Sequence, residues 1–216
     1  MPSATLSEAE SKVLLGKVGI VFAEERVVST PAAASAAARS IGTPVVVKLN
    51  GDRIAHKTER GLVRLNVATP DDAAIAAAEL LTKVTPADGD VSLLVARLIR
   101  GTREFIAGLA TDAQFGKTVM LGVGGVLAEA VADVVFGLVP ISIDDAHDMI
   151  DELASQSLLL AFRGEPAVDR DALAHVLVSL SRLAEADASV LSVDLNPLII
   201  ADGRPIAVDA LVEKAR

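Results

Sequence analysis

A chain of 216 residues is long enough to bury one large hydrophobic core or two smaller ones. A formal charge of −9 and the lack of Trp and Tyr argue against general nucleic-acid binding, which needs a basic face or stacking aromatic rings. The absence of Cys excludes disulfides and thiolate metal sites, and no apolar run reaches the roughly eighteen residues of a membrane span.

The N-terminal segment reads MPSATLSEAESK and has neither a basic start nor an apolar stretch. We therefore expect no signal peptide and no membrane association, and a cytoplasmic location fits a chain without Cys. Ser7 and Glu10 have the spacing of a capping box, which predicts a helix over residues 7–18.

The remaining elements follow from hydrophobic periodicity, Pro and Gly punctuation and β-branched runs. In chain order we expect a strand over 24–30, a helix over 31–42, strands over 43–50 and 62–67 flanking a polar loop, a helix over 71–82, strands over 91–99, 103–111 and 118–123, helices over 126–132, 144–154 and 169–186, and a terminal strand pair within 192–212.

Helices and strands alternate, but several strands are neighbours joined only by turns. This pattern predicts an α+β fold with mixed sheets. We expect two lobes, an N-terminal one over residues 1–97 and a C-terminal one over 98–216.

The terminal strand pair carries oxygen-rich side chains where a core would favour apolar ones. Asp194 and Asn196 are two apart and share a strand face, and Asp209 can lie across from them if the strands pair about Asp202-Gly203. Such donors suit Mg²⁺. The alternative is that Asn196-Pro197 begins a turn and Asp209 is a capping residue.

Two further segments suggest anion binding. Lys48 ends the apolar strand PVVVKL, where it either contacts a phosphate or extends to solvent at the strand end. His56 lies in the loop IAHKTERG, in which nearby cations and Gly61 allow a close approach to phosphates. A loop histidine is, however, more often simply solvated.

Other candidates are weak individually. Glu104 follows a glycine turn. Gly124-Gly125 precedes an expected helix, and the pair either forms an anion-binding site at the helix N-terminus or simply makes a tight turn between strand and helix. Arg163, in AFRGEPAVD, is available for a phosphate, a partner or a surface salt bridge.

The order of these segments resembles the ATP-grasp domain of ADP-forming acyl-CoA synthetases, relatives of succinyl-CoA synthetase β chains. The resemblance runs from about Val13 to Val212. It rests on PVVVKL, IAHKTERG, LLVARLIRG, GTREFIAG, DAQFGKTVMLGVGGVLAE, AFRG, LNPLII and VDALV.

This resemblance implies an ATP-grasp fold in which two lobes hold the nucleotide between them. Lys48 and Gly61 would contact ATP phosphates, main-chain groups of Ala96, Arg97 and Leu98 would bind adenine, and Glu104 would accept from the ribose hydroxyls. Asn196 and Asp209 would hold Mg²⁺, with Asp194 as polar support, and His56 would be the catalytic residue that carries phosphate as phosphohistidine. Gly124, Gly125 and Arg163 would contact a phosphate or the partner.

The resemblance also implies a ligase subunit that needs an α-type partner. The partner would supply the CoA-binding and ligase-type domains, for which we expect no room in this chain. The reaction would be carboxylate + CoA + ATP ⇌ acyl-CoA + ADP + phosphate. The acyl group and the choice between ATP and GTP are not predicted.

The sequence departs from the family pattern at three places. Leu62 follows Gly61 where relatives often have a second glycine, Gly137 stands where arginine is common, and the glycine before Glu104 comes one position early. These departures favour an alternative, a non-catalytic nucleotide-binding or regulatory module. A stand-alone ATP-grasp carboxylate ligase is a second alternative.

Overall fold

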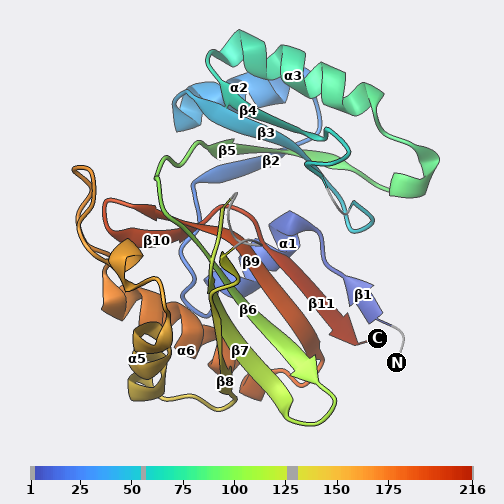
Figure 1. Cartoon of the computed structure of the whole chain (residues 1–216). Coiled ribbons are helices and arrows are strands. Elements are labelled where there is room, and N and C mark those ends of the chain that lie inside the picture. Colours follow the sequence, from blue (N-terminus) through green and yellow to red (C-terminus); the bar gives the residue numbers. More distant parts are fainter. Residues whose placement is uncertain (1–2, 55–56, 126–130, 216) are drawn as a thin grey trace. The chain divides into compact units, whose positions relative to one another are not determined.

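The computed structural model describes residues 3–54, 57–125 and 131–215 (Figure 1). These residues form two compact units. Unit 1 contains residues 3–4, 11–22, 99–125 and 131–215, and unit 2 contains residues 5–10, 23–54 and 57–98. Across the described ranges, none of the helices combines the length and apolar character needed to cross a membrane.

Unit 2 is built on a four-stranded antiparallel sheet with two helices on one face (Figure 1). The strand order is β2-β5-β3-β4, with β2 over Glu25–Val28, β3 over Val45–Asn50, β4 over Val63–Val67 and β5 over Ser92–Arg97. The helices are α2, Pro31–Ile41, and α3, Pro70–Thr82, and a short 3-10 helix covers Pro86–Asp88.

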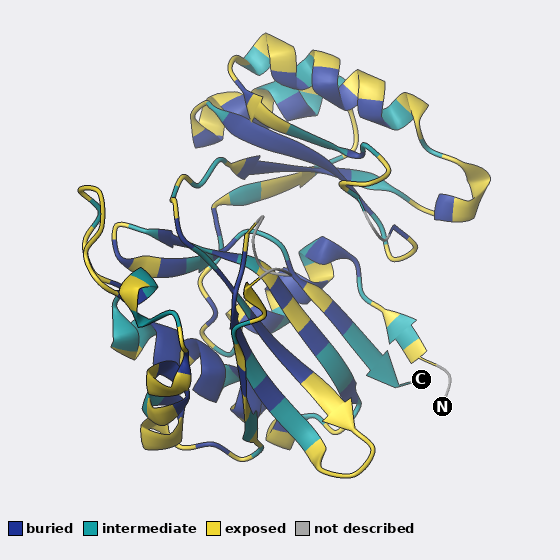
Figure 2. Ribbon diagram, viewed as in Figure 1, coloured by how far each residue is buried: buried dark blue, intermediate teal, exposed yellow. Residues whose placement is uncertain are grey.

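Both helices of unit 2 begin with the same dipeptide, Thr-Pro. Thr30 and Thr69 cap α2 and α3, each accepting a backbone N–H three residues on, and Pro follows each cap at the first helical position. Each helix buries one face, made of Ala, Leu and Ile side chains, and exposes the opposite face (Figure 2). The resulting core contains Ala34, Ala38, Ile41, Val45, Val47, Leu49, Leu62, Ala73, Ala77, Leu80, Leu93 and Val95.

Unit 1 contains a seven-stranded sheet with the order β1-β11-β9-β6-β7-β8, and β10 also pairs with β9. The strands are β1 (Ser3–Thr5), β6 (Glu104–Asp112), β7 (Gly116–Val123), β8 (Val134–Leu138), β9 (Val190–Ala201), β10 (Arg204–Ala207) and β11 (Leu211–Ala215). The last residue of β1, Thr5, belongs to unit 2.

The helices α5, Ile143–Glu152, and α6, Arg170–Ala186, pack against each other beside this sheet (Figure 1). Ser142 forms a capping box with Asp145 at the start of α5, and Asp169 caps α6. A 3-10 helix covers Gln156–Leu159, and helix α1 covers Glu8–Gly16 near the N-terminus. Ser7 and Glu10 form the predicted hydrogen bonds at the start of α1.

The predicted α+β class is confirmed, and each expected helix and strand has a counterpart, except the helix over 126–132, of which residues 126–130 lie outside the described ones. We expected mixed sheets, whereas the strand ladders with a described register are antiparallel. The sequence-based boundary at 97/98 lies one residue before the change of unit at Leu98/Ile99, but residues 11–22 belong to unit 1 rather than to the N-terminal lobe.

Candidate functional site

Lys48 is buried in unit 2 with a carboxylate partner. It lies on β3 between Val63 of β4 and Leu94 of β5, and the residue is only 6% exposed. Its Nζ is 2.8 Å from Oε1 of Glu8, itself 4% exposed. Lys48 therefore does not extend to solvent, and its charge is compensated inside the unit.

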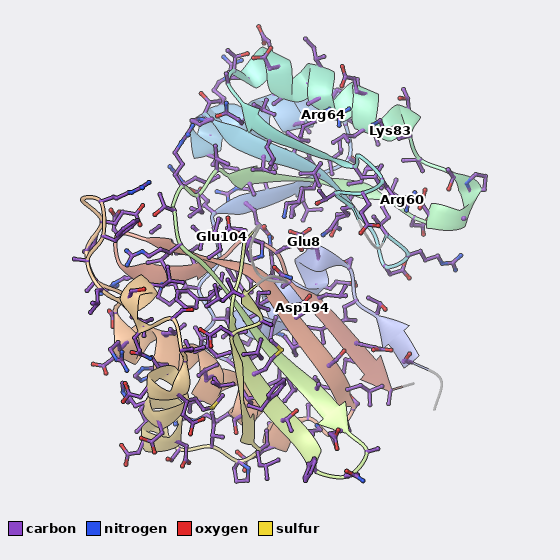
Figure 3. All side chains as sticks on the ribbon, in the orientation of Figure 1. Glu8, Arg60, Arg64, Lys83, Glu104 and Asp194 are labelled. Atoms are coloured by element: carbon purple, nitrogen blue, oxygen red, sulfur yellow. The ribbon has the colours of Figure 1, made fainter. Side chains whose placement is uncertain are left out.

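Glu8 was not identified from the sequence. Its second oxygen, Oε2, pairs with Nζ of Lys57, so one carboxylate contacts two lysines. Glu8 is labelled in Figure 3. The capping box marked Glu8 as a first-turn residue of α1, but nothing in the sequence indicated contacts 40 and 49 positions away. His56, the predicted phosphate carrier, lies outside the described residues.

Gly61 ends a tight turn, and its carbonyl is contacted by Arg64 and Lys83, both labelled in Figure 3. Its N–H donates to the Thr58 carbonyl, and its φ of 64° is in the region that favours glycine. The Gly61 carbonyl accepts from Arg64 Nη1 at 3.0 Å and from Lys83 Nζ at 2.9 Å. The neighbouring Leu62 is 1% exposed and belongs to the hydrophobic core, so this departure from the family pattern has a packing role.

The segment Ala96, Arg97 and Leu98 closes β5 in unit 2. The N–H of Arg97 donates to the Glu24 carbonyl at 2.8 Å, and that of Leu98 donates to the Pro44 carbonyl at 3.3 Å. The Arg97 guanidinium donates to the Ile41 carbonyl at the end of α2. Two main-chain N–H groups of the segment predicted to bind adenine are thus used within the unit.

Glu104, Gly124 and Gly125 lie together in unit 1. The N–H of Gly124 donates to the Glu104 carbonyl at 2.7 Å, and a Cβ on Gly124 would lie 3.1 Å from the backbone of Glu104 and Phe105. A Cβ on Gly125 would lie 3.6 Å from the Glu104 carboxylate. The paired glycines therefore allow the chain after β7 to approach Glu104 closely, and the Glu104 side chain is partly exposed.

The terminal strands bring Asp194, Asn196 and Asp209 to one region of unit 1. Asp194 and Asn196 are exposed on β9 on either side of buried Leu195, as expected for one strand face. Two residues of β9, Asn196 and Pro197, oppose the single residue Ile106 of β6, which is a β-bulge. Asn196-Pro197 therefore does not begin a turn.

The register along the other edge of β9 places Asp209 beside Asn196. Asp202 and Gly203 have φ values of 50° and 79° and form a two-residue hairpin turn, after which β10 pairs back to Leu198. Strand β11 then pairs Leu211 with Asp194. Asp209 lies between these two ladders, and its Oδ1 accepts from the Ala210 N–H.

Asp194 and Asp209 interact electrostatically. Desolvation by the surrounding chain raises the pKa of the Asp194 carboxyl, and the negative charge of Asp209 raises it further. A cation between such groups relieves this repulsion, and an amide with carboxylates offers the hard oxygen donors that Mg²⁺ prefers. Among residues 3–54, 57–125 and 131–215, no three His, Cys, Asp or Glu side chains form a metal-binding group.

Arg163 is exposed on a turn that a second arginine anchors. Arg163 has a φ of 50° and stacks on the Phe162 ring at 5.1 Å. Arg103, which is 3% exposed, donates to the carbonyls of Leu158, Leu160 and Pro166 and pairs with Glu165 at 3.3 Å. Arg103 thus fixes the segment from which Arg163 projects, a role that the sequence alone did not indicate.

The sequence matches the ATP-grasp domain family over residues 2–213. It is 34% identical over 208 residues to the β subunit of acetate–CoA ligase [ADP-forming] I of Pyrococcus furiosus, covering 95% of this chain and 90% of that one. It is 35% identical over 204 residues to acetate–CoA ligase [ADP-forming] I of Archaeoglobus fulgidus, where it spans 93% of this chain but only 30% of the longer relative.

The fold is similar to solved structures of dinucleotide forming acetyl-coenzyme A synthetase 1 of Ca. Korarchaeum cryptofilum. The complex with coenzyme A and Ca-AMPCP superposes with a TM-score of 0.90 at 32% identity, covering 98% of this chain and 94% of that one. A complex with coenzyme A and Mg-AMPPCP, whose phosphohistidine segment points towards the nucleotide binding site, gives 0.84 at 33% identity, covering 98% and 93%.

Proposed function

This chain belongs to the ATP-grasp domain family, and we propose that it is the nucleotide-binding, phosphoryl-transferring β-type subunit of an ADP-forming acyl-CoA synthetase. Its curated relatives include β subunits of ADP-forming acetate–CoA ligases. The reaction is carboxylate + CoA + ATP ⇌ acyl-CoA + ADP + phosphate. We assign CoA and carboxylate binding to an α-type partner, because the relative from Archaeoglobus fulgidus is more than three times as long as the matched segment.

The observation that carries this proposal is the convergence of Asp194, Asn196 and Asp209 on β9 and the connection that follows β10. Three oxygen-bearing side chains on a strand surface contribute little to a core, whereas they suit a metal that binds phosphates. In this role Asn196 and Asp209 hold Mg²⁺, and Asp194 supports them. Mg²⁺ held by these residues would supply positive charge that stabilises the transferred phosphoryl group.

The other residues bind and orient the nucleotide. In unit 2, the Lys48 ammonium contacts the phosphates, and carbonyl groups near Ala96 and Leu98 bind the adenine amino group. In unit 1, the Glu104 carboxylate accepts hydrogen bonds from the ribose hydroxyls. Phosphoryl transfer depends mainly on such positioning and on charge stabilisation.

In the proposed transfer, a neutral imidazole nitrogen of His56 attacks the γ-phosphorus of ATP. The new N–P bond forms as the bond to the β,γ-bridging oxygen breaks, and ADP leaves. The phosphoryl group then passes to the carboxylate on the partner, giving an acyl phosphate. The CoA thiolate displaces phosphate from that acyl phosphate to give acyl-CoA.

Incubation with γ-³²P-ATP and Mg²⁺ tests this function. We expect the wild-type chain to acquire an acid-labile, base-stable label and the His56→Ala variant to acquire none, because phosphohistidine has this stability pattern and phosphoserine does not. Mass spectrometry of the labelled peptide locates the phosphate.

Three outcomes would contradict the proposal. Equal labelling of the wild type and His56→Ala would assign the phosphate to another residue. Mg·ATP binding without labelling, even after addition of the acyl-CoA-binding partner, would instead identify a non-catalytic nucleotide-binding module. Acyl-CoA formation by this chain alone would identify a stand-alone ligase.

A further inference from the structure

A buried carboxylate links Lys48, which the proposed function assigns to the phosphates, to Lys57 in the same unit. The Glu8 side chain is 2% exposed, and each of its oxygens contacts one ammonium group. Oε1 is 2.8 Å from Nζ of Lys48, and Oε2 pairs with Nζ of Lys57. The lysine side chains are themselves 8% and 14% exposed, so water screens neither pair strongly.

The backbone at the start of α1 holds Glu8 at this position. The N–H of Ala9 donates to Oδ1 of Asn50 at 3.0 Å, and Nδ2 of Asn50 donates to Oγ of Ser92 at 2.9 Å. These bonds tie the first turn of α1 to the ends of β3 and β5. The carboxylate also lies at a helix N-terminus, where the helix dipole favours negative charge. Glu8 is therefore a fixed anion and not a flexible surface group.

The two lysines contacted by Glu8 have different places in the proposed reaction. Lys48 is the residue assigned to the nucleotide phosphates. Lys57 directly follows His56, the residue assigned to carry the phosphoryl group. A single carboxylate thus contacts the phosphate-binding lysine and the chain next to the phosphate carrier.

We propose that Glu8 is a positioning residue for phosphoryl transfer, which orients Lys48 toward the nucleotide phosphates and holds the chain at Lys57. This inference rests on the proposed function. A long ammonium side chain has many rotamers, and a buried carboxylate restricts them before the nucleotide binds. Glu8 would also reduce the cost of keeping two positive charges in a buried cluster.

The Glu8→Gln variant tests the inference, because it keeps the size of the side chain but removes its charge. The amide retains one oxygen, so it replaces at most one of the two contacts. We expect the Kd of Mg·ATP to rise about tenfold or more, as for loss of a hydrogen bond to a charged group. We also expect the rate of phosphohistidine labelling at saturating ATP to fall.

Glu10→Gln is the matched control. Glu10 lies in the same helical turn and bonds to Ser7, but its carboxylate contacts neither lysine in any described hydrogen bond. We expect this variant to alter the melting temperature and to leave the Kd and the labelling rate unchanged. A merely structural role of the charge at the start of α1 would give both variants the same effect.

Lys57→Gln separates the two contacts of Glu8 and stays informative if Glu8→Gln fails to fold. It removes the contact near His56 and retains that with Lys48. We expect slower labelling at saturating ATP with a Kd within about twofold of the wild type, a difference too small to reflect a lost charged hydrogen bond. Unchanged labelling of Lys57→Gln would overturn the inference.

Other results would also contradict it. A folded Glu8→Gln variant with wild-type Kd and labelling would show that the carboxylate positions nothing. A lower Kd would show that Glu8 competes with phosphate for the lysines instead of orienting them. Failure of the wild type to bind Mg·ATP would refute the proposed function itself, and is distinct from these results.

Discussion

Charged side chains inside this protein are held by specific partners. Glu8 pairs with Lys48 in unit 2, and Arg103 in unit 1 donates to three carbonyls and one carboxylate. Among the described residues, every buried side-chain nitrogen and oxygen has a hydrogen-bond partner. Since removal of one partner leaves the other buried and unpaired, such sites are sensitive to substitution.

Asp187 gives a pH-dependent test at the scale of a single residue. It accepts from Lys214 Nζ at 2.8 Å and from Ser189 Oγ at 2.6 Å, and these bonds lower the pKa of its carboxyl to about 2. A lowered pKa in the folded state means that the ionised carboxylate stabilises the fold above its unfolded pKa. That contribution falls as the pH drops from about 4 and is lost below about 2.

We therefore expect Asp187→Asn to destabilise the protein at pH 7 by up to about 1 kcal/mol, since the pair is partly screened by solvent. Urea unfolding at pH 7 and pH 3 should show a smaller difference between variant and wild type at the lower pH. Asp148→Asn, an exposed substitution on α5, is the control. A difference that grows on acidification would contradict the assignment.

At the scale of the elements, two glycines that we noted as departures from the family pattern, Gly101 and Gly137, lie where neighbouring elements approach closely. Gly101, the early glycine before Glu104, packs against β9, where an added Cβ would lie 2.7 Å from Ile199 Cγ2 and closer still to the Ile200 carbonyl oxygen. Gly137 on β8 lies under Met149 of α5, whose Sδ would be 2.7 Å from a Cβ. These two departures thus have packing explanations.

Gly101→Ala should destabilise unit 1 by about 2 kcal/mol or more, because backbone atoms of β9 cannot move aside as a side chain can. Thermal unfolding measures this change. Gly16→Ala is the control, since a Cβ there has no neighbour within 4 Å, and it should be neutral or stabilising. Equal melting temperatures for the two variants would show that the chain at Gly101 relaxes without cost.

At the scale of the whole molecule, local signals predicted most elements but not the contacts between distant ones. Thr-Pro caps and β-branched runs located α2, α3 and β3 within a few residues. The strands β1, β8 and β11 were missed, because unlike the similarly short β2 and β4 they carry no β-branched or alternating run bounded by clear turn signals.

In the candidate site, too, local features were predicted from the sequence and contacts between distant segments were not. The spacing of Asp194 and Asn196 predicted a shared face, because strand alternation is a local property. Glu8 and Arg103 were missed because their partners come from distant segments and a single buried ion pair has no sequence pattern. Residues assigned to the nucleotide occur in both units, Lys48 in unit 2 and Glu104 and Asp209 in unit 1.

The most direct test of the central claim is calorimetric titration of the chain with ATP, with and without Mg²⁺. We predict binding that depends on Mg²⁺ and that weakens about tenfold or more in Asp209→Asn, which loses a charged ligand to the ion. Asp202→Asn, at the exposed hairpin turn, makes the same chemical change and should bind as the wild type. Binding that is indifferent to Mg²⁺, or an Asp209→Asn variant with wild-type affinity, would contradict the account.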